Sequence, residues 1–527
     1  MVFRYWFYIY SIIALILVAL FYQITVEALW LLVIVIPLIL VGLYDITQGK
    51  RNILRNYPLW GHWRYILLSI RPMIQQYFIA TNLSERPFNM EQRELVKERA
   101  TQTLDSLPFG TQQDVRKVDY EWMNHSIAPQ KPEPSTARIT IGNEQCQHPY
   151  SASRLNISAM SYGALSSHAI RALNRGAKVG SFYHNTGEGG LSHYHLKEGG
   201  DIVWQIGTGC FGCRTEDGGF DPKQFQDKAQ LDAVKMIEIK ISQGAKPSHG
   251  GILPADKISP EIAKIRGIPM GEDCLSPPHH PGFSTPRELL QFVQQLRELS
   301  GGKPVGFKLC IGQPHEFMGI CKAMLATGIY PDFITVDGSE GGTGAAPVEF
   351  SNYLGTPLND AIIIVRNCLV GIGAKDKIKI ISSGKIITGF DITLKLALGA
   401  DLCNSARGMM FALGCVQSLR CNKNTCPTGV ATQDPGRIYS LNVNDKAPRV
   451  HHFHQSTIDS FLEVLGAAGL KTAEDLKPRH IYRRISPHEA RHYDEIYTFL
   501  EPNQLTEERN LPSMYSEEWQ LANADRF

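Results

Sequence analysis

The chain has 527 residues, more than one ordinary hydrophobic core accommodates, so we expect more than one structural unit. Its formal net charge is only +2, which excludes the basic footprint of a nucleic-acid-binding protein. The 11 cysteines are scattered and odd in number, which excludes a secreted disulfide framework and indicates a reducing compartment.

The chain begins with two uncharged, strongly apolar runs, residues 5–26 and 28–44, which Glu27 separates. A membrane-spanning helix needs about 20 apolar residues, so the first run is long enough and the second is slightly short. The second run contains Pro37, which transmembrane helices tolerate. The alternative is a signal peptide followed by a buried helix, but a signal peptide has an apolar core of about 7–15 residues and a small-residue cleavage site. The pattern therefore favours a two-helix transmembrane hairpin.

Basic residues flank this hairpin on both sides. Arg4 precedes it, and Lys50, Arg51 and Arg55 follow it. Because cytoplasmic flanks are rich in Lys and Arg, both ends of the hairpin and everything after Lys50 are expected in the cytoplasm, at the cell inner membrane. The aromatic and basic stretch 62–78 fits equally a helix on the bilayer surface and a helix packed on the main domain.

From residue 155 onward, short apolar runs alternate with helical patterns, as in α/β proteins. Glycines and polar residues follow the apolar runs, and no G-x-G-x-x-G fingerprint opens a first unit, so a (β/α)8 TIM-type barrel is favoured over an open doubly wound sheet. The candidate strands are residues 155–160, 180–185, 202–207, 236–242, 305–310, 332–338, 378–384 and 400–406. The candidate helices are residues 166–178, 285–300, 316–328 and 390–399.

Three cysteines lie close together in the C-terminal third, Cys415, Cys421 and Cys426, spaced C-x5-C-x4-C. Thiolates are the usual protein ligands of iron–sulfur clusters, and a cluster with three irons needs three of them. A zinc site completed by a distant histidine and three unrelated buried cysteines are the alternatives. The spacing by itself leaves these three interpretations open.

Six motifs in order give the chain a family resemblance. They are SAMSYGALS (158–166), NTGEGG (185–190), QGAKPSHGG (243–251), LSPPHH (275–280), DGSEGGTGAAP (337–347) and CNKNTCPTGVATQDP (421–435). Over roughly residues 150 to 440 the chain resembles the flavin domain of glutamate synthase. The resemblance implies an FMN at the barrel mouth and a [3Fe–4S] cluster bound by the three cysteines.

The residues expected at the FMN follow candidate strands. Lys308 ends an apolar strand, where an ammonium group would stabilise the reduced flavin at N1 and O2, although an ordinary exposed lysine is the alternative. The glycine-rich loop and the next strand end are suited to a phosphate, or are ordinary turns. The expected flavin-ring residues are Met160, Ser161, Tyr162 and Gly163, and the expected phosphate residues are Gly338, Gly341, Gly342, Gly344, Ser383, Gly384 and Lys385.

The resemblance also places Glu188, Lys246 and Arg266 near the family's 2-oxoglutarate site. Lys246 and Arg266 carry the charge that binds carboxylates, and Glu188 is suited to proton transfer to an imine, which makes Glu188 and Lys246 the candidate catalytic residues. Alternatively, Glu188 only orders its glycine turn, and Arg266 pairs with Glu261 or Glu272 at the surface.

The chain departs from the family at this site. Ile252 stands where the family commonly has a glutamine that helps to hold 2-oxoglutarate, and His249 replaces a glutamate, which leaves the substrate open. Cys210 and Cys213 form a C-x2-C pair that is either a redox couple or two barrel-mouth residues.

These patterns give one functional hypothesis and two alternatives. The hypothesis is a membrane-anchored FMN and iron–sulfur oxidoreductase that reduces the imine of 2-oxoglutarate, or of a related 2-oxo acid, plus ammonia to an amino acid. The family's glutaminase and glycine-repeat domains are not recognisable, so ammonia is expected from solution or from another protein. A pyridine-nucleotide motif is not recognisable either, so electrons are expected from a ferredoxin, a reductase subunit or a quinone. The alternatives are an amino-acid or amine dehydrogenase that reduces a membrane quinone and a non-catalytic membrane assembly protein.

The expected domain organisation has four parts. They are the hairpin at residues 1–50, a juxtamembrane and connector region at 51–145, the FMN-binding barrel with the iron–sulfur loop at 146–470, and a C-terminal extension at 471–527.

Overall fold

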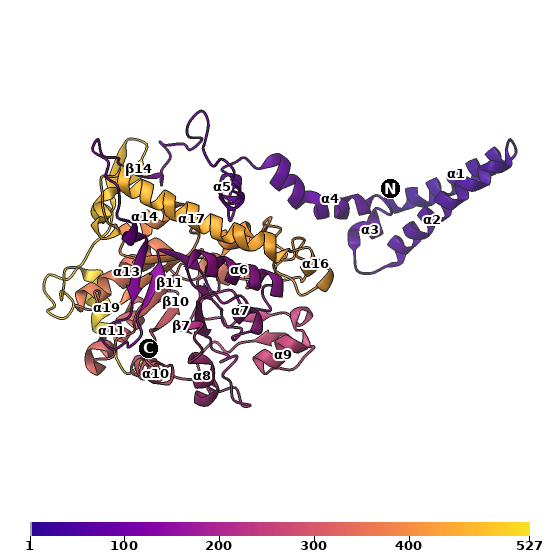
Figure 1. The fold of residues 1–527 in the computed structure, drawn as a ribbon. Helices are drawn as coiled ribbons and strands as arrows, with labels where there is room; N and C mark the ends of the chain where they lie inside the picture. Colours follow the sequence, from indigo (N-terminus) through magenta and orange to yellow (C-terminus); the bar gives the residue numbers. More distant parts are fainter. Residues whose placement is uncertain (1–2) are drawn as a thin grey trace. The chain divides into compact units, whose positions relative to one another are not determined.

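The structure is a computed structural model that describes residues 3–527. It divides into two compact units, one that ends at Met90 and one that comprises Glu91–Phe527 (Figure 1). Each unit is described by itself below.

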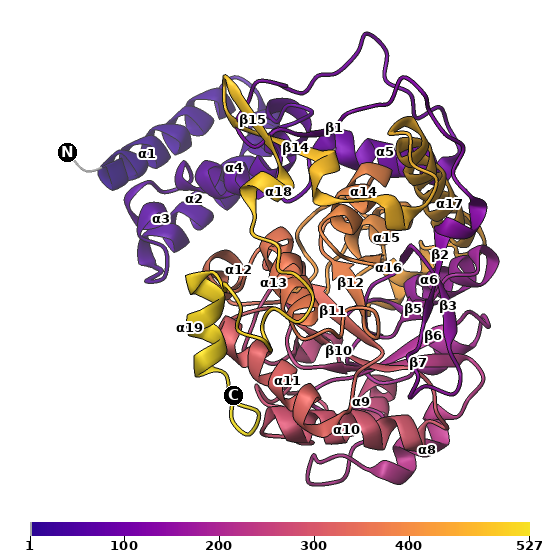
Figure 2. The same ribbon diagram turned by 90° about the vertical axis from the view of Figure 1, so that its left-hand side faces the viewer.

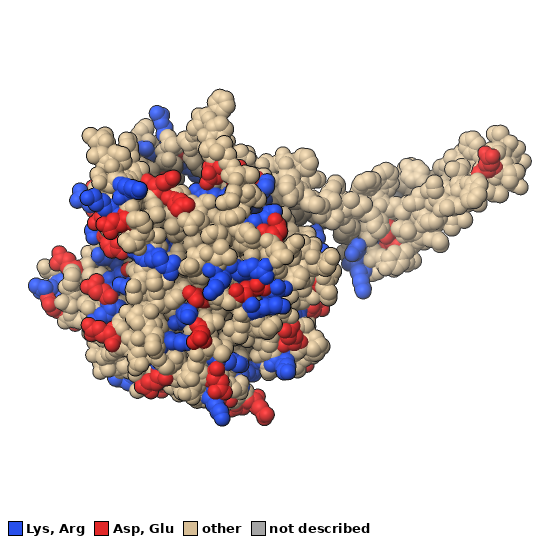
Figure 3. Space-filling model, in the orientation of Figure 1, with Lys and Arg blue, Asp and Glu red and all other residues tan. Residues whose placement is uncertain are grey.

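The N-terminal unit is built on two long apolar helical segments. They are α1 (Phe3–Tyr22), followed by the 3-10 helix η1 (Val26–Leu31) and α2 (Leu32–Thr47), which contains Pro37. The segments Arg4–Tyr22 and Val26–Thr47 are long and apolar enough to cross a membrane. The surface that α1 and α2 present in Figure 3 carries almost no charged side chains. This confirms the two apolar helices of the predicted hairpin.

A buried carboxylate ties the end of α2 to the helices that follow it. Asp45 is fully buried and accepts a hydrogen bond from the backbone N–H of Leu59 at 3.0 Å. Its carboxylate also lies 2.9 Å from Nε2 of His62, near the start of α4. The helices of this region are α3 (Asn52–Asn56), α4 (Gly61–Ile74) and the π-helix η2 (Gln75–Ile79). Stretch 62–78 is therefore helical, and Trp63 and Phe78 on it are exposed.

The second unit contains a closed barrel of eight parallel strands, which confirms the predicted (β/α)8 fold. Neighbouring strands pair in chain order, and the last strand pairs with the first. Seven of the eight candidate runs contain a barrel strand, and the eighth, residues 236–242, overlaps β7, which begins two residues earlier. The strands are β4 (Leu155–Ile157), β5 (His184–Asn185), β6 (Ile202–Ile206), β7 (Val234–Lys240), β10 (Val305–Leu309), β11 (Phe333–Asp337), β12 (Lys379–Ser383) and β13 (Leu402–Ser405).

The helices around the barrel begin at side-chain caps. Ser166, Thr285 and Thr388 each accept a backbone N–H at the N-terminus of their helix, which satisfies a donor that would otherwise lack a partner. The four candidate helices correspond to α6, α10, α11 and α14. The main helices are α6 (Ser167–Gly180), α8 (Pro222–Ala229), α10 (Pro286–Leu299), α11 (Pro314–Thr327), α13 (Leu358–Gly371), α14 (Gly389–Ala397) and α17 (Val443–Ala467).

The long helix α17 lies along α6 and α14 (Figure 1). At Gly176 of α6, an added Cβ would be 2.7 Å from Cβ of Val450 and 2.8 Å from the carbonyl oxygen of Ala447. Because such distances are too short for a side chain, a glycine is required where these two helices meet.

A hairpin closes the amino-terminal end of the barrel. It consists of β2 (Arg138–Ile141) and β3 (Tyr150–Ser153), which pair antiparallel. Ile141 and Ala152 of the hairpin are fully buried in a cluster with side chains from five barrel strands and with Tyr183, which directly precedes β5. The core of the barrel is therefore sealed at this end, and the carboxyl ends of the strands are left for a site.

The C-terminal extension packs against earlier parts of the second unit. Strands β14 (Ile481–Ser486) and β15 (Glu489–His492) form a sheet with β1 (Glu121–Met123), and α19 (Ser513–Leu521) lies beside α11 (Figure 2). The remaining helices are α5 (Met90–Thr101), α7 (His193–Leu196), α9 (Pro260–Arg266), α12 (Val348–Tyr353), α15 (Arg407–Ala412), α16 (Pro435–Tyr439) and α18 (Tyr493–Ile496), and the remaining strands are β8 (Ile252–Leu253) and β9 (Cys274–Leu275).

Candidate functional site at the barrel mouth

Glu188 lies in the loop after β5, in an ion pair with a lysine that the sequence analysis did not identify. Nζ of Lys240, the last residue of β7, is 2.7 Å from Oε1 of Glu188. The carboxylate is enclosed by bare backbone, since a Cβ at Gly251 would be 2.5 Å from Oε1 and a Cβ at Gly207 would be 2.7 Å from Cβ of Glu188. The glycines of these loops therefore make room for one buried carboxylate.

The charges around Glu188 are coupled. Burial raises the pKa of Glu188, but Lys240, Lys246 and Arg266 together outweigh burial and hold it below its ordinary value. Burial also lowers the pKa of Lys246 to about 8, against the opposing influence of Glu188 and with a further lowering by Lys240. At neutral pH Glu188 is therefore a carboxylate, while Lys246 is the cation closest to releasing a proton.

Lys246 and Arg266 are buried and carry no carboxylate ion pair among residues 3–527. Nζ of Lys246 donates to the carbonyl oxygen of Ala345 at 2.9 Å. Nη2 of Arg266 makes only long contacts, 3.3 Å to the carbonyl oxygen of Tyr162 and 3.5 Å to Oγ of Ser161. Both side chains therefore keep positive charge that a bound anion would neutralise.

The alternative of a surface ion pair for Arg266 is wrong. Arg266 is 4% exposed, and Glu261 accepts hydrogen bonds from the hydroxyls of Tyr162 at 2.8 Å and Tyr194 at 3.1 Å instead. The guanidinium lies over the ring of Phe211, with its carbon 5.1 Å from the ring centroid. Arg266 is thus held beside the loop that contains Ser161 and Tyr162.

Lys308 has an acidic neighbour on the adjacent strand. Its Nζ is 3.3 Å from Oδ2 of Asp337, which also accepts the backbone N–H of Gly244 at 2.9 Å. Both side chains of the ion pair are nearly buried at the ends of β10 and β11. Nearby, the hydroxyls of Ser158 and Ser383 lie 3.2 Å apart and join the loops that follow β4 and β12.

The glycine loop after β11 uses part of its backbone internally. The N–H of Gly338 donates to the carbonyl of Ser383 at 3.1 Å, and the N–H of Gly341 donates to the carbonyl of Gly338 at 2.8 Å. Those two N–H groups are therefore engaged, contrary to the expectation that all four glycines offer free donors. Among the described residues, the N–H groups of Gly342 and Gly344 have no protein acceptor.

Arg407 is a cation at this loop that the sequence analysis missed. A Cβ at Gly342 would be 2.8 Å from Nε of Arg407, and Nη2 of Arg407 donates to the carbonyl of Glu340 at 2.8 Å. Gly384 and Lys385 both have positive φ values, 151° and 50°, so the turn after β12 is tightly constrained. Gly342 and Lys385 thus lie in the loops after β11 and β12, and Arg407 begins α15 just after β13, at strand ends where barrels commonly bind phosphate.

The three cysteines of the C-x5-C-x4-C motif influence one another's ionisation but are not arranged as a preformed ligand set. No group of three or more His, Cys, Asp or Glu side chains in residues 3–527 has metal-binding geometry. Burial raises the pKa of Cys415 to about 12, with further raising by the charges of Cys421 and Cys426. The pKa of Cys421 is also raised, first by burial and then by the charge of Cys426.

Cys426 differs from the other two thiols. Burial raises its pKa, but the hydroxyl of Thr428 and backbone N–H groups of Thr428, Val430 and Ala431 outweigh burial and lower it. Nearby, Nζ of the buried Lys257 donates to the carbonyl of Cys421 at 3.2 Å and to that of Ala164 at 2.7 Å. A loop with three thiols, N–H donors and a buried cation has the chemistry that an anionic iron–sulfur cluster requires.

Below the mouth, a second carboxylate lies inside the barrel. Glu238 is fully buried and accepts hydrogen bonds from Asn185 at 2.7 Å, Gln205 at 2.6 Å and Thr335 at 2.6 Å. Oδ1 of Asn185 accepts the N–H of Gly187 at 3.0 Å. This network therefore links β5, β6, β7 and β11 and fixes the turn that precedes Glu188.

The sequence differs from the family at Ile252, and it carries the additional pair Cys210 and Cys213. Ile252 is half-buried in β8 and pairs with Leu275 of β9. Cys210 and Cys213 are buried free thiols, and burial raises the pKa of Cys210 to about 12 and that of Cys213 well above its ordinary value. High pKa values mean little thiolate at neutral pH, so the chemistry does not favour the redox-couple interpretation of this pair.

The sequence analysis did not identify four charged residues of the site, although three of them occupy recognisable positions. The four are Lys240, Lys257, Asp337 and Arg407. Lys240 and Asp337 end apolar strands, Lys308 is the last residue but one of such a strand, and Arg407 follows the last strand in the run SARG. The position of Lys257 depends on the insertion after β7, for which the sequence has no local signal.

A closed eight-stranded barrel with a charged, glycine-rich site at the carboxyl ends of its strands defines a (β/α)8-barrel enzyme. Residues 87–471 match the family model described as the conserved region in glutamate synthase. The glutamate synthase large subunit-like protein YerD of Bacillus subtilis (strain 168) is 37% identical over 496 residues, which cover 86% of this chain and 94% of YerD. The chain belongs to the glutamate synthase family and is an oxidoreductase.

Other similar proteins share a smaller part of the chain. An archaeal-type glutamate synthase [NADPH] of Thermotoga neapolitana is 35% identical over 335 residues, which cover 63% of this chain and 62% of that relative. Among solved structures, a mandelate oxidase with benzaldehyde has 13% sequence identity and a TM-score of 0.41, and it covers 76% of this chain and 98% of its own. At this similarity, no function is inferred from the mandelate oxidase.

Proposed function

We propose that this protein forms an amino acid from a 2-oxo acid and ammonia, with 2-oxoglutarate as the first candidate substrate. The observation that supports this most directly is the Glu188 cluster, where one carboxylate lies among Lys240, Lys246 and Arg266. Family membership supports the same reaction type, because its relatives are named glutamate synthases.

The two cations without a carboxylate partner would hold the substrate. Arg266 offers a planar guanidinium that suits a carboxylate, and Lys246 offers a second positive charge near Glu188. The substrate's carboxylates would replace the long contacts that Arg266 makes with the 161–162 backbone and side chain. Because Ile252 supplies no amide group, these two cations would contribute most of the affinity for the substrate.

The pKa values assign different roles to Glu188 and Lys246. Glu188 stays ionised, so it would stabilise the positive charge of the iminium group that forms when ammonia condenses with the oxo acid. Lys246, with a pKa of about 8, would deliver the proton with which the carbonyl oxygen leaves as water. This assignment gives the proton transfer to Lys246, whereas the sequence analysis expected Glu188 to transfer a proton to the imine.

FMN is the cofactor that fits the site. The loop of Met160 to Gly163 would line the ring, Lys308 would face its N1/O2 edge, and Gly342, Gly344, the turn at 383–385 and Arg407 would hold the phosphate. Bound there, FMN supplies the hydride that reduces the imine. Gly338 and Gly341 would shape the loop rather than donate to the phosphate.

A [3Fe–4S] cluster would be bound by Cys415, Cys421 and Cys426 and would pass electrons towards the flavin. Thiol chemistry, the donors around Cys426 and the buried Lys257 support this assignment. The electrons would come from a separate ferredoxin, reductase subunit or quinone. The archaeal-type relatives carry [NADPH] in their name, which supports a reduced nicotinamide as the original source of these electrons.

The N-terminal unit would anchor the protein in the cell inner membrane by two transmembrane helices, with the barrel in the cytoplasm. The uncharged surface of α1 and α2 and the basic residues that flank them support this topology. The exposed aromatic side chains of α4 and η2 suit the membrane interface.

Flavin reoxidation tests the reaction. Purified protein is reduced anaerobically with dithionite and then mixed with 2-oxoglutarate and ammonium together, or with each alone. We expect the flavin absorbance to return only with both, together with formation of glutamate. Reduction of the oxidised flavin by amino acids, without reoxidation by any 2-oxo acid plus ammonium, would contradict the proposal.

A further inference from the structure

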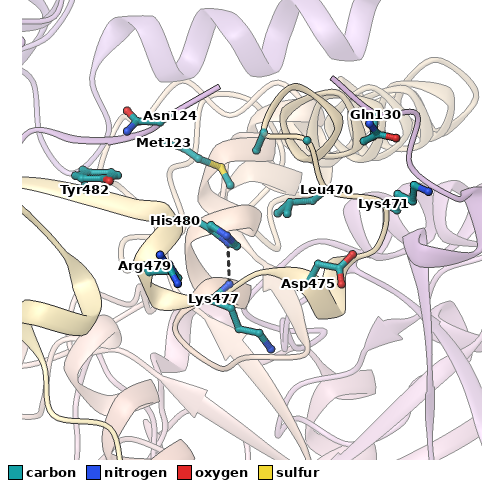
Figure 4. A pocket seen from close by; sticks show the side chains of 12 residues that line it. Met123, Asn124, Gln130, Leu470, Lys471, Asp475, Lys477, Arg479, His480 and Tyr482 are labelled. Carbon is teal, nitrogen blue, oxygen red and sulfur yellow. Dashed lines mark hydrogen bonds between the residues drawn. The ribbon is translucent and has the colours of Figure 1, made fainter. Parts of the chain in front are cut away.

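A pocket with a volume of about 900 Å³ contains none of the candidate site residues in its lining (Figure 4). Residues 468–482 form most of its lining, together with Met123 of β1. Arg154, immediately before the first barrel strand, donates to the carboxylate of Glu474 in the same segment. The pocket is thus on the amino-terminal side of the barrel and is separate from the proposed catalytic site.

Three cations of this pocket have no carboxylate partner in residues 3–527. They are Lys471, Lys477 and Arg479, and the one hydrogen bond of their charged groups is a 3.5 Å contact from Lys477 to the carbonyl of Glu474. Asp475 also lines the pocket, but its carboxylate caps its own turn by accepting from Thr472. Three cations and one carboxylate leave an excess of two positive charges, so the pocket suits a dianion.

His480 adds a neutral donor to this group. Its Nδ1 accepts the backbone N–H of Lys477 at 3.1 Å, as Figure 4 shows. In the neutral ring the proton is then on Nε2, which is the nitrogen left to meet a ligand. The η6 turn (Pro478–His480) therefore fixes the orientation of the imidazole beside Lys477 and Arg479.

The lining of the pocket also includes apolar side chains and an aromatic ring. Met123, Leu470 and Tyr482 line it, and Tyr482 stacks on Trp122 with ring centroids 5.6 Å apart. Pockets for organic ligands usually have volumes of about 300–1,000 Å³, so this one is too large for an inorganic ion alone. A ligand that fills it would have a flat apolar part as well as a charged part.

We propose that this pocket binds a nucleotide-sized organic phosphate, with its phosphate on Lys477 and Arg479 and its ring against Tyr482. A phosphate group carries about −1.5 to −2 charges at pH 7, which matches the uncompensated charge of the lining. A short dicarboxylate has a similar charge but no ring for the apolar side chains. The segment's ion pair to Arg154 gives such a ligand a physical connection to the start of β4.

Calorimetric titration tests the proposal on the full-length, FMN-loaded protein in detergent, with ADP as the probe. We expect ADP to bind the wild type and the control Lys223→Ala, whose exposed lysine is on α8, and to bind the double variant Lys477→Ala/Arg479→Ala at least tenfold more weakly. Failure of ADP to bind the wild type at millimolar concentration, or equal affinity in the double variant, would overturn the proposal.

A second variant keeps the test decisive if the double variant does not fold. Tyr482→Leu retains every cation and removes the ring, so ADP should bind several-fold more weakly while inorganic phosphate binds as it does to the wild type. Unchanged ADP affinity, or stronger binding of succinate than of ADP to the wild type, would contradict an organic phosphate ligand. Neither measurement depends on flavin reoxidation, so the two proposals fail independently.

Discussion

Replacing Lys240 with methionine would remove the direct partner of Glu188 while keeping most of the side-chain volume. Lys240 is 8% exposed and Glu188 17% exposed, so solvent screens their 2.7 Å ion pair only weakly. Breaking a buried pair from one side costs about 3–5 kcal/mol. Because Lys246 and Arg266 still act on Glu188, we expect the low end of that range, about 3 kcal/mol of lost free energy of unfolding at pH 7.

The effect has a definite pH dependence. The pKa of Glu188 is lowered in the folded protein, so its pair stabilises the fold above the ordinary glutamate pKa of about 4.3 and ceases to do so as pH falls through the lowered value. In Lys240→Met that pKa rises relative to the wild type, and the carboxyl becomes neutral at a higher pH. The difference in stability between the two proteins should therefore be largest near pH 7 and shrink towards pH 4.

Urea unfolding of the full-length protein in detergent, followed by tryptophan fluorescence at several pH values, measures this difference. Lys223→Met is the matched control, because that lysine is exposed, and it should change stability by less than about 0.5 kcal/mol. A Lys240→Met variant as stable as the wild type at pH 7, or a loss that does not change with pH, would refute the assignment of a charged pair.

Four further predictions concern the cluster, the membrane and, in two cases, the substrate. Cys421→Ser should abolish the iron signal while FMN remains bound, and stoichiometric zinc without iron in anaerobically purified wild type would contradict this. Deletion of residues 1–48 should give a soluble and still yellow protein, and a C-terminal reporter active only outside the cytoplasm would exclude the proposed topology. Arg266→Ala should weaken 2-oxo acid binding about 10- to 150-fold, the effect of losing a charge-assisted contact of about 1.5–3 kcal/mol, without changing the FMN spectrum. Ile252→Gln should tighten 2-oxoglutarate, whereas reduced turnover with the real substrate would indicate a pocket for an apolar side chain.

The barrel could be predicted from the sequence because its signals are local. Each strand is a short apolar run followed by glycine or polar residues, and helices such as α6 and α14 begin at Ser166 and Thr388, which are caps that a sequence displays. The hairpin of β2 and β3 escaped prediction because its burial depends on side chains from distant strands.

Only part of the site could be predicted, because the contacts of its residues also depend on distant parts of the chain. Lys240 and Lys308 look alike in sequence, since each is near or at the end of an apolar strand. The structure pairs one with Glu188 and the other with Asp337, which depends on which strands are neighbours. Likewise, the burial of Arg266 beside Ser161 follows from the insertion after β7, and no pattern around residue 266 indicates it.

The hairpin at the amino-terminal end of the barrel limits how reactants reach the site. Ile141 and Ala152 are wholly shielded from solvent in a cluster with side chains from five barrel strands, so the hairpin covers the barrel core on that side. Under the proposed function, ammonia and the oxo acid would then both enter from the carboxyl ends of the strands. If the bound oxo acid covers Glu188, ammonia has to bind first, so the fold imposes an order of substrate binding. Steady-state kinetics should then show that excess oxo acid inhibits the reaction and that added ammonium relieves this inhibition.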